Sequence, residues 1–575
     1  MGDKSIKIKK LIEKEEYEKA FKLAQKYVKK GDPKIQNIIG YLYKNGLGTE
    51  QNYEEAIKWF KKSADQGNEK AQFNLAVMYH NGEGMEQDYK EAFKLFLDSA
   101  NNGYSNAQFW LVEMYGEGKG VEKNPSEAFK WCLKSAEQGH DAAQLHVGVM
   151  YYFGDGVKQN YNEALKWSLK SAEQGNMYAQ LNVGVMYHKG EGVKQDYNEA
   201  LKWYLKSAEQ GYADAQHSVG IMYYEGTGIE RDYKKAIEWF EKSANGGCCA
   251  AYIWLGVMNY YGQGTEKNYK EAKKYYEIAI ENGDVEANHN LGFLYYKGEG
   301  VEKNHNKAKK YFLNGANQGC SESQYMLGTM YYHGEEGTEQ NCKEAISWFL
   351  KAAEQGNVDA QRALGTIYYS GAEGVEQDYK QAIKWYGKAA LQGDSCSQFE
   401  YAQMHYFGKG TRKNTKEAFK WIDRAARQGD CLAQYNLGVM YENGEETAKD
   451  EKTAFSWYCQ AAKNGSPEGL YAVGQFYRYG KGGVSVDYKT AMEYFKKSAE
   501  LGNTDAQYSI GEMYENGIGV ARRCEIAKEW YKKAAEQGDK NSRNAHERLE
   551  QFISNVRKDP VKAYHELASR DKQNR

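Results

Sequence analysis

A glycine recurs along this chain at a nearly constant interval, and its spacing constrains the fold more than any other feature. The first eight intervals are 36 residues each, and the later ones are 36 or 37. A fixed period in this range is typical of repeat proteins, in which each unit buries its apolar face only by stacking on its neighbours. The recurring glycines are Gly31, Gly67, Gly103, Gly139, Gly175, Gly211, Gly247, Gly283, Gly319, Gly356, Gly393, Gly429, Gly465, Gly502 and Gly538. We therefore expect one elongated solenoid rather than the roughly four domains that length alone would suggest.

The unit that ends at Gly211 illustrates the pattern. Its first helix is predicted by a small residue, Ala179, followed by Val183 four positions later and Met186 seven positions later, which together form one apolar stripe. A glycine-rich loop follows, and the second helix is predicted to begin after Asp196 and to end at Gly211. We expect Gly211 and its equivalents to have positive φ, because they stop one unit just before the next begins.

A further glycine lies inside the first helix in eleven of the fourteen units. These glycines are Gly40, Gly148, Gly184, Gly220, Gly256, Gly292, Gly328, Gly365, Gly438, Gly474 and Gly511. Each destabilises a helix interior by about 1 kcal/mol relative to alanine. We expect the second helix to approach so closely at these positions that a Cβ atom would be in the way.

The second helix has its own start signal. Asp or Asn stands at its N-cap in thirteen units, as Asn52 does, and Glu often follows three residues later, as Glu55 does. This spacing predicts a capping box, in which each of the two side chains accepts from a backbone N–H of the other residue. Alanine follows the N-cap by four residues in all fourteen units, and tryptophan often takes the next apolar position, as Ala56 and Trp59 do. We expect both to be buried where the two helices interlock.

The pattern divides the chain into three parts and predicts an all-α solenoid. Residues 1–32 are predicted to be an N-terminal half-repeat, a single capping helix with the spacing of a second helix. Residues 33–541 hold the repeats. Residues 542–575 are expected to form C-terminal capping helices and a disordered tail, because the repeat pattern decays after Gly538.

Charge and cysteine usage restrict the classes of function. The 77 Lys and Arg residues are balanced by 79 Asp and Glu residues, whereas a nucleic-acid-binding protein more often has a basic surplus. The nine cysteines fall at mostly unrelated positions of the repeat, which argues against a disulfide framework and indicates a reducing compartment. No apolar stretch is long enough for a membrane span and none resembles a secretory signal, so we expect a cytoplasmic protein.

The repeat motif resembles that of a known family. The pattern LGxMYxxGxGVxxDYxxAxxWYxKAAEQG, which residues 184–211 match closely, is similar to the Sel1-like repeat, a relative of the tetratricopeptide repeat. The resemblance implies a right-handed superhelix of antiparallel helix pairs, with the first helices lining its concave side. It also implies a scaffold or adaptor for protein complexes, and it brings no enzymatic activity with it.

Two positions of the first helix lie opposite its apolar stripe and are nevertheless rich in aromatic residues. Nine positions after the opening residue stand residues that recur so regularly that we expect them to seal the contact between repeats: His80, Tyr152, His188, Tyr224, Tyr260, Tyr296, Tyr332, Tyr369 and Tyr406. Two positions after the opening residue the side chains vary more, as expected of residues that contact partners. The candidate partner-binding residues are Phe73, Phe109, Leu145, Leu181, His217, Tyr325, Arg362, Phe399, Tyr435, Tyr471 and Tyr508.

These observations favour a non-catalytic scaffold that binds protein or peptide partners in the concave groove. A hydrolase embedded in the repeats and a nucleic-acid-binding solenoid are the alternatives. We identify no catalytic residues and expect no cofactor, because the chain contains no nucleophile motif and its loop glycines lack the strand and the Lys-Ser/Thr pair of a phosphate-binding loop. His188 and His217 lie on adjacent repeats, but no ligand cluster at metal-binding spacing accompanies them, so we expect no metal site. The partner's identity and the oligomeric state stay open.

Overall fold

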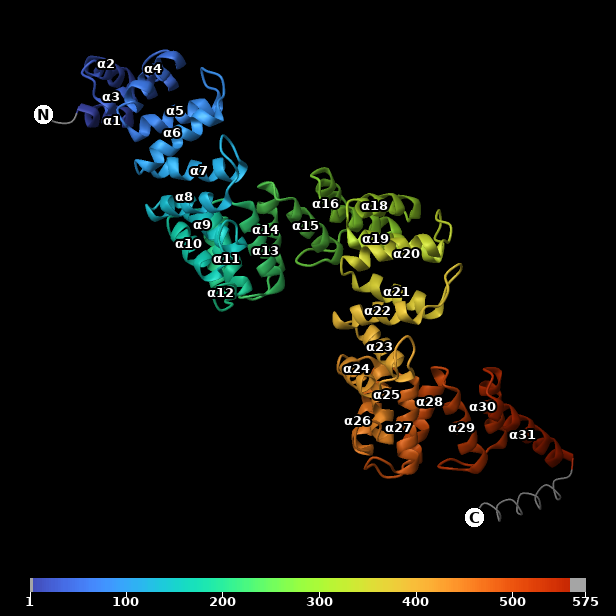
Figure 1. The fold of residues 1–575 in the computed structure, drawn as a ribbon. Helices are drawn as coiled ribbons and strands as arrows, with labels where there is room; N and C mark the ends of the chain where they lie inside the picture. Colours follow the sequence, from blue (N-terminus) through green and yellow to red (C-terminus); the bar gives the residue numbers. More distant parts are fainter. Residues whose placement is uncertain (1–3, 559–575) are drawn as a thin grey trace. The chain divides into compact units, whose positions relative to one another are not determined.

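The computed structural model describes residues 4–558 and contains 31 α-helices in that range. The described residues form two compact units, divided between residues 287 and 288. Figure 1 shows successive helices packed side by side within each unit. The one β-bridge among the described residues joins Ala372 and Val375 in a loop. The fold is therefore an all-α solenoid of about fourteen repeats, as the sequence predicts.

The first unit begins with a short helix pair and continues with full repeats. Its helices are α1 (Lys4–Glu13), α2 (Tyr17–Val28), α3 (Pro33–Asn45), α4 (Tyr53–Ala64), α5 (Glu69–Asn81), α6 (Tyr89–Asn101), α7 (Ser105–Glu117), α8 (Pro125–Glu137), α9 (Asp141–Phe153), α10 (Tyr161–Glu173), α11 (Met177–Lys189), α12 (Tyr197–Glu209), α13 (Ala213–Glu225), α14 (Tyr233–Asn245), α15 (Cys249–Tyr261) and α16 (Tyr269–Glu281). The boundary between the units falls within α17 (Glu286–Lys297). From α3 to α30, odd-numbered helices are the first helices of repeats and even-numbered helices are the second.

The second unit repeats the same arrangement and ends in a longer helix. Its helices are α18 (His305–Asn317), α19 (Ser321–His333), α20 (Cys342–Glu354), α21 (Val358–Ser370), α22 (Tyr379–Leu391), α23 (Ser395–Phe407), α24 (Thr415–Arg427), α25 (Cys431–Asn443), α26 (Glu451–Lys463), α27 (Pro467–Tyr479), α28 (Tyr488–Glu500), α29 (Thr504–Asn516), α30 (Cys524–Glu536) and α31 (Lys540–Lys558).

The two ends of the described chain cover the terminal repeats. At the N-terminus the structure has two helices, α1 and α2, where the sequence predicts one, because Ile8 gives α1 an apolar contact and is fully buried in a cluster with Phe21 and Ile39. At the C-terminus Ala545 and Leu549 of α31 pack against the last repeat. The helix expected after Pro560 and the predicted tail lie outside the described residues.

The glycines inside the first helices confirm the predicted close approach. A Cβ atom built on Gly220 would lie 2.6 Å from a ring carbon of Phe240 on the second helix. In ten of the eleven repeats the nearest atoms belong to such an aromatic ring; the exception is Gly148, which faces Ser168. Real Cβ contacts essentially never fall below 3.0 Å, so the glycine is required by the ring that lies on it.

The second-helix caps are confirmed in part. The Asn52 side chain accepts from the N–H of Glu55 at 3.0 Å, as predicted. The second bond of the capping box would run from the Asn52 N–H to the Glu55 carboxylate. It does not form, because the Asn52 N–H instead donates to the carbonyl of Tyr43 in the first helix at 2.9 Å. The Glu55 carboxylate instead accepts from the indole N–H of Trp59 at 3.1 Å and from Lys58 at 2.7 Å. The cap therefore also fastens the loop to the first helix.

The tryptophans lie at the margin of the helix pair rather than at its centre. Trp131, Trp167, Trp348, Trp385 and Trp421 are buried, whereas the other five at this position are half-buried. A lysine three residues later usually covers the ring, as Lys170 does with its Nζ 3.8 Å from the centroid of the Trp167 ring. Such cation–π contacts add about 0.5–1 kcal/mol at exposed sites.

Buried glutamines connect the repeats, which the sequence pattern did not reveal. Gln180 in α11 donates to the carbonyl of Ala172 in the preceding repeat at 3.1 Å and accepts from Gln210 of its own repeat at 2.8 Å. The same intra-repeat bond joins Gln36 to Gln66, Gln72 to Asn102, Gln108 to Gln138, Gln144 to Gln174, Gln324 to Gln355, Gln361 to Gln392, Gln398 to Gln428, Gln434 to Asn464 and Gln507 to Gln537. An amide that makes both bonds, as Gln180 does, links three helices.

The recurring glycines have positive φ, as the sequence predicts, with values from 77° to 98°. At Gly211 the φ value is 91°, and a Cβ atom there would meet no atom within 4 Å. The requirement for glycine is therefore conformational and not steric. Gly211 ends the second helix by donating to the carbonyl of Ala208 at 3.0 Å.

We predict that Gly211→Val lowers the stability of the protein by about 1–2 kcal/mol, because a β-branched residue is strained at this φ value. The measurement is the midpoint of urea unfolding followed by circular dichroism. Glu209→Ala, an exposed change in the same helix end, is the matched control and should leave the midpoint in place. An equal midpoint for Gly211→Val and the control would contradict the conformational explanation.

A second prediction concerns the ring contact of Gly220. Gly220→Val should destabilise by about 1–3 kcal/mol, because its side chain overlaps the Phe240 ring. Combining it with Phe240→Cys reproduces the Val112–Cys132 pair that occurs naturally in α7 and α8. The double variant should therefore be more stable than the sum of the single changes indicates, as a double-mutant cycle of urea unfolding will measure. Strict additivity would show that the two positions do not share this contact.

Candidate functional site

The first helices of successive repeats share one face, which we call the first-helix face. It consists of the side chains two, three, six, nine and ten positions after the small residue that opens each first helix. In α11 these are Leu181, Asn182, Val185, His188 and Lys189. The sequence predicts positions two and nine of this face, and the structure adds positions three, six and ten.

Four of the residues nine positions after the opening residue bond to the next repeat, as expected of residues that seal this contact. The Tyr152 hydroxyl donates to Glu191 in the loop of the next repeat at 2.6 Å. Burial and this hydrogen bond raise the pKa of Tyr152, which keeps the hydroxyl protonated as the donor. Equivalent bonds join Tyr224 to Gln263, Tyr296 to Glu335 and Tyr406 to Glu445.

The candidate residues two positions after the opening residue are partly covered by neighbouring side chains. Phe399 is buried and the other ten are half-buried. Phe73 lies with its ring centroid 5.7 Å from that of Phe96 on its own second helix and 5.2 Å from that of Tyr104 at the start of the next repeat. Likewise, the ring centroid of Phe109 lies 5.0 Å from that of His140 at the start of the next repeat.

Most of the remaining candidates also pack within their own helix pair or against the next one. Leu145 packs against an apolar cluster formed by α10 and α11, and Leu181 packs against one formed by α12 and α13. The other aromatic contacts pair a candidate with the second-helix ring of its own repeat: His217 with Phe240, Tyr325 with Phe349, Tyr435 with Tyr458, Tyr471 with Phe495 and Tyr508 with Tyr531. Burial lowers the pKa of His217, so this ring is neutral at pH 7. The candidates therefore recur once per repeat instead of gathering into one cluster.

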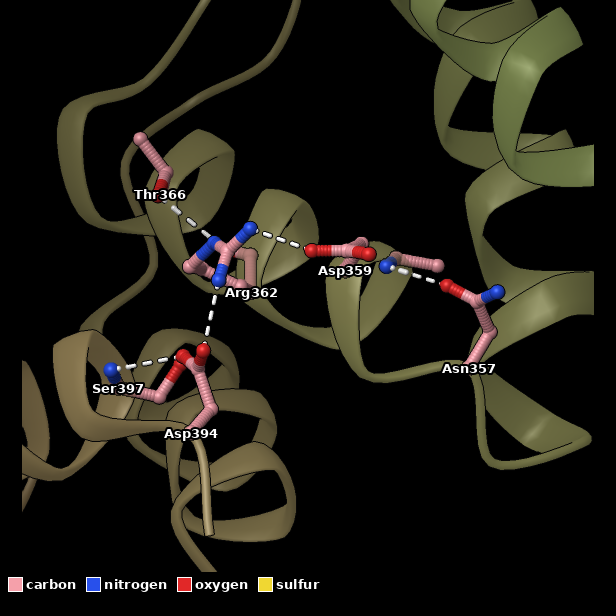
Figure 2. Close-up of polar contacts among 7 residues, drawn as sticks. Asn357, Asp359, Arg362, Thr366, Asp394 and Ser397 are labelled. Carbon is pink, nitrogen blue, oxygen red and sulfur yellow. Dashed lines mark hydrogen bonds and ion pairs between the residues drawn. The ribbon is translucent and has the colours of Figure 1, made fainter. Parts of the chain in front are cut away.

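Arg362 differs from the other candidates because its charge is already paired (Figure 2). Its guanidinium donates to Asp394 at 2.7 Å and also pairs with Asp359. Asp394 in turn accepts from the N–H of Ser397 at 2.9 Å and so caps α23. Burial works to lower the pKa of Arg362, but the two carboxylates outweigh it and raise the pKa. Arg362 thus ties α21 to the start of α23, and an acidic partner would have to compete with Asp394 for it.

Pockets open along the first-helix face where consecutive repeats meet. The most apolar of them has a volume of about 250 Å³ and lies between α9 and α11, with Ser168 of α10 among its lining residues. Its other lining residues are Gly148, Val149, Tyr152, Phe153, Asn182, Val185 and Met186. A second pocket, of about 200 Å³, includes the candidates Tyr325 and Arg362.

Sequence reasoning missed two features of this face. Phe153, Tyr261, Phe407 and Tyr479, all ten positions after the opening residue, expose between 57% and 72% of their surface. Their signal in the sequence is a large aromatic residue at the last position of the first helix. The second feature is Ser168, which stands in a column that is otherwise mostly aromatic.

The histidines considered for metal binding contact aromatic rings. His188 lies 5.1 Å from the Tyr197 ring and His217 lies 5.7 Å from the Phe240 ring. Within residues 4–558, no three His, Cys, Asp or Glu side chains form a group that could hold a metal ion. Over the same residues, none of the helices combines the length and the apolar character needed to cross a membrane.

Comparisons with known proteins find similar chains among solved structures. The structure of a protective antigen from uropathogenic Escherichia coli strains, described as displaying an SLR fold, is 29% identical over 86% of this chain and 97% of that chain, with a TM-score of 0.49. A Sel1 repeat protein from Oxalobacter formigenes is 30% identical over 54% of this chain and 90% of that chain, with a TM-score of 0.45. A comparison with curated proteins finds no match.

The family model for the Sel1 repeat matches fourteen consecutive segments. They are residues 34–68, 69–104, 105–140, 141–176, 178–212, 213–248, 249–284, 285–320, 321–357, 358–394, 397–430, 431–466, 467–503 and 504–539. Their boundaries follow the recurring glycines and their start follows the predicted beginning of the repeats at residue 33. With this match and the helix pairs described above, the chain belongs to the Sel1 repeat family.

Proposed function

We propose that this protein is a non-catalytic scaffold that binds protein or peptide partners along its first-helix face, the face that the family resemblance implies lines a concave groove. The observation that carries the proposal is the row of pockets on this face. Side chains from consecutive first helices line them, as those of α9 and α11 do around the pocket at Ser168. Apolar hollows of this kind accept the anchor side chains that supply most of the energy of a protein interface.

The exposed aromatic residues ten positions after the opening residue support the assignment of the first-helix face as the binding surface. Phe153 exposes 72% of its surface and lies beside the pocket between α9 and α11. Large apolar side chains that stay in water mark interaction surfaces when a hollow lies next to them. The rings of Phe153, Tyr261 and Phe407 each contact the ring of the preceding tyrosine, at centroid distances of 5.0, 4.7 and 5.1 Å. These contacts reduce the free energy that a partner loses to ordering the side chains.

The balance of charges favours a protein partner over a nucleic acid. The net charge is −2, and many lysines are engaged with carboxylates or tryptophan rings, such as Lys202 with Glu199 and Lys206 with Trp203. No contact among residues 4–558 favours the embedded hydrolase. A cytoplasmic location is part of the proposal, on the argument from the positions of the cysteines.

We predict that replacing Phe153, Tyr261, Phe407 and Tyr479 together with serine weakens partner binding by about tenfold or more, because the four side chains are exposed anchors and contribute little to folding. The measurement is the dissociation constant, by fluorescence anisotropy, of peptides selected on the wild-type protein from a random display library. The matched control is Leu391→Ser with Leu501→Ser, which removes exposed apolar side chains at the ends of second helices.

The control should bind the peptides like the wild type, and circular dichroism should show equal helicity for all three proteins. Equal affinity of the four-residue variant and the control would contradict the assignment of the first-helix face. Salt-sensitive retention of labelled single-stranded RNA or DNA, with no peptide selected, would instead favour the nucleic-acid-binding alternative.

A further inference from the structure

Three repeats lack the aromatic ring that fills the same place in the other eleven. The second-helix residue that faces the internal first-helix residue is Phe60, Phe96, Cys132, Ser168, Tyr204, Phe240, Tyr276, Phe312, Phe349, Tyr386, Ile422, Tyr458, Phe495 and Tyr531 in chain order. Eleven of these fourteen are Phe or Tyr. The other three are Cys132, Ser168 and Ile422, and they show whether another side chain fills the space of the absent ring.

Two of the three departures are compensated. Cys132 packs with Val112, where most repeats have glycine, so the first helix supplies the missing volume. Ile422 is itself large and packs against Ala402. Ser168 alone is small and faces a glycine, and its Oγ would lie 2.4 Å from a Cβ atom on Gly148. This repeat therefore lacks volume on both helices.

The pocket between α9 and α11 occupies the resulting space. It measures about 250 Å³, and both Gly148 and Ser168 line it together with Val149, Val185 and Met186. An apolar cavity of roughly 150 Å³ is enough to bind benzene. The volume and the lining therefore suit a phenyl ring, which would regain the contacts that the resident ring makes in neighbouring repeats.

We propose that this pocket binds the phenylalanine side chain of a partner protein segment, seated where the ring of Tyr204 or Phe240 lies in the next two repeats. The inference rests on the proposed function and specifies one anchor of the partner. The ring enters from the first-helix face, whereas the resident ring of other repeats comes from the second helix.

The side chains that would surround a hydroxyl in this pocket favour phenylalanine over tyrosine as the partner's residue. Where the resident ring is Tyr458, its hydroxyl donates to Glu442, nine positions after the opening residue, at 2.8 Å. Where it is Tyr386, the hydroxyl lies 3.0 Å from Thr366, six positions after the opening residue. In the repeat of Gly148 these two positions hold Tyr152 and Val149.

Neither of these residues is suited to receive a tyrosine hydroxyl from a partner. Val149 has no polar side-chain atom, and the Tyr152 hydroxyl is already bonded to Glu191 at 2.6 Å, with Lys189 Nζ at 3.5 Å. A tyrosine seated like Tyr458 or Tyr386 would therefore lack the partner that Glu442 or Thr366 supplies there, which is costly, so this pose favours a ring without a hydroxyl. The same bonds fix Tyr152 as a wall of the pocket, which is therefore formed before a partner arrives.

The test uses the full chain and variants that fill or move the pocket. Ser168→Phe places a ring on Gly148 as Phe240 does on Gly220, so it should fold with an equal or higher melting temperature. Ser168→Ala leaves the pocket open and is the matched control. Ser168→Phe with Phe240→Ser fills this pocket and opens the equivalent one two repeats later. Toluene, detected by saturation-transfer NMR and calorimetry, reports an open ring-sized pocket.

We expect toluene to bind the wild type, Ser168→Ala and the double variant, and not Ser168→Phe. Among peptides selected on the wild type, those with a phenylalanine that is essential for binding should lose about tenfold or more in affinity for Ser168→Phe. Changing that phenylalanine to alanine should cause a similar loss on the wild type and no further loss on Ser168→Phe.

The outcomes separate this inference from the proposed function. If selected peptides bind Ser168→Phe and the wild type equally, or if toluene does not distinguish them, the inference falls and the scaffold function stands. If the wild type selects no peptide, the proposed function falls and takes the inference with it. If tyrosine peptides depend on Ser168 as strongly as phenylalanine peptides, the selectivity argued from Val149 and Tyr152 is wrong.

Discussion

The contact of an aromatic ring on a helix glycine is the interaction on which the repeat depends. In ten repeats a Phe or Tyr of the second helix lies against a glycine of the first, so closely that a Cβ atom would overlap the ring. This contact sets the distance between the two helices, and the alanines around it are fully buried because the backbones are near each other. Glycine weakens the isolated helix by about 1 kcal/mol, and the buried ring offsets that loss.

Hydrogen bonds then connect one helix pair to the next. The buried Gln180 bonds both to its own repeat and to the carbonyl of Ala172 in the preceding one, and Tyr152 reaches Glu191 in the repeat that follows. These bonds join nearest neighbours, as expected of a solenoid whose stability is the sum of repeat and interface terms. A regular first-helix face results, on which side chains vary without disturbing the contacts beneath.

Much of this fold was predictable because its determinants recur. The period of the recurring glycines, the N-caps, the positive φ at Gly211 and the close approach at Gly220 all follow from local chemistry repeated many times. The glutamine bonds were missed because a lone Gln is usually a surface residue, and its burial depends on a partner 30 residues away, as with Gln180 and Gln210. The helix α1 was missed because its apolar residues contact a neighbour and show no repeat spacing.

The candidate site was harder to predict, because a helical wheel describes one helix and ignores its neighbours. It correctly assigned Tyr152 to the contact between repeats. It placed Phe73 and Arg362 on a face open to partners, which stays a prediction; in the structure Phe73 also packs on Tyr104 and Arg362 pairs with Asp394. The pocket at Ser168 depends on a missing side chain, which is visible only when the repeats are aligned and their volumes compared. Serine and phenylalanine codons can differ by a single base, so one nucleotide change separates a repeat that fills its own core from one that leaves the place to another protein. A scaffold of this kind can thus acquire or lose a binding specificity by emptying or refilling one position, while every other contact of the stack stays the same.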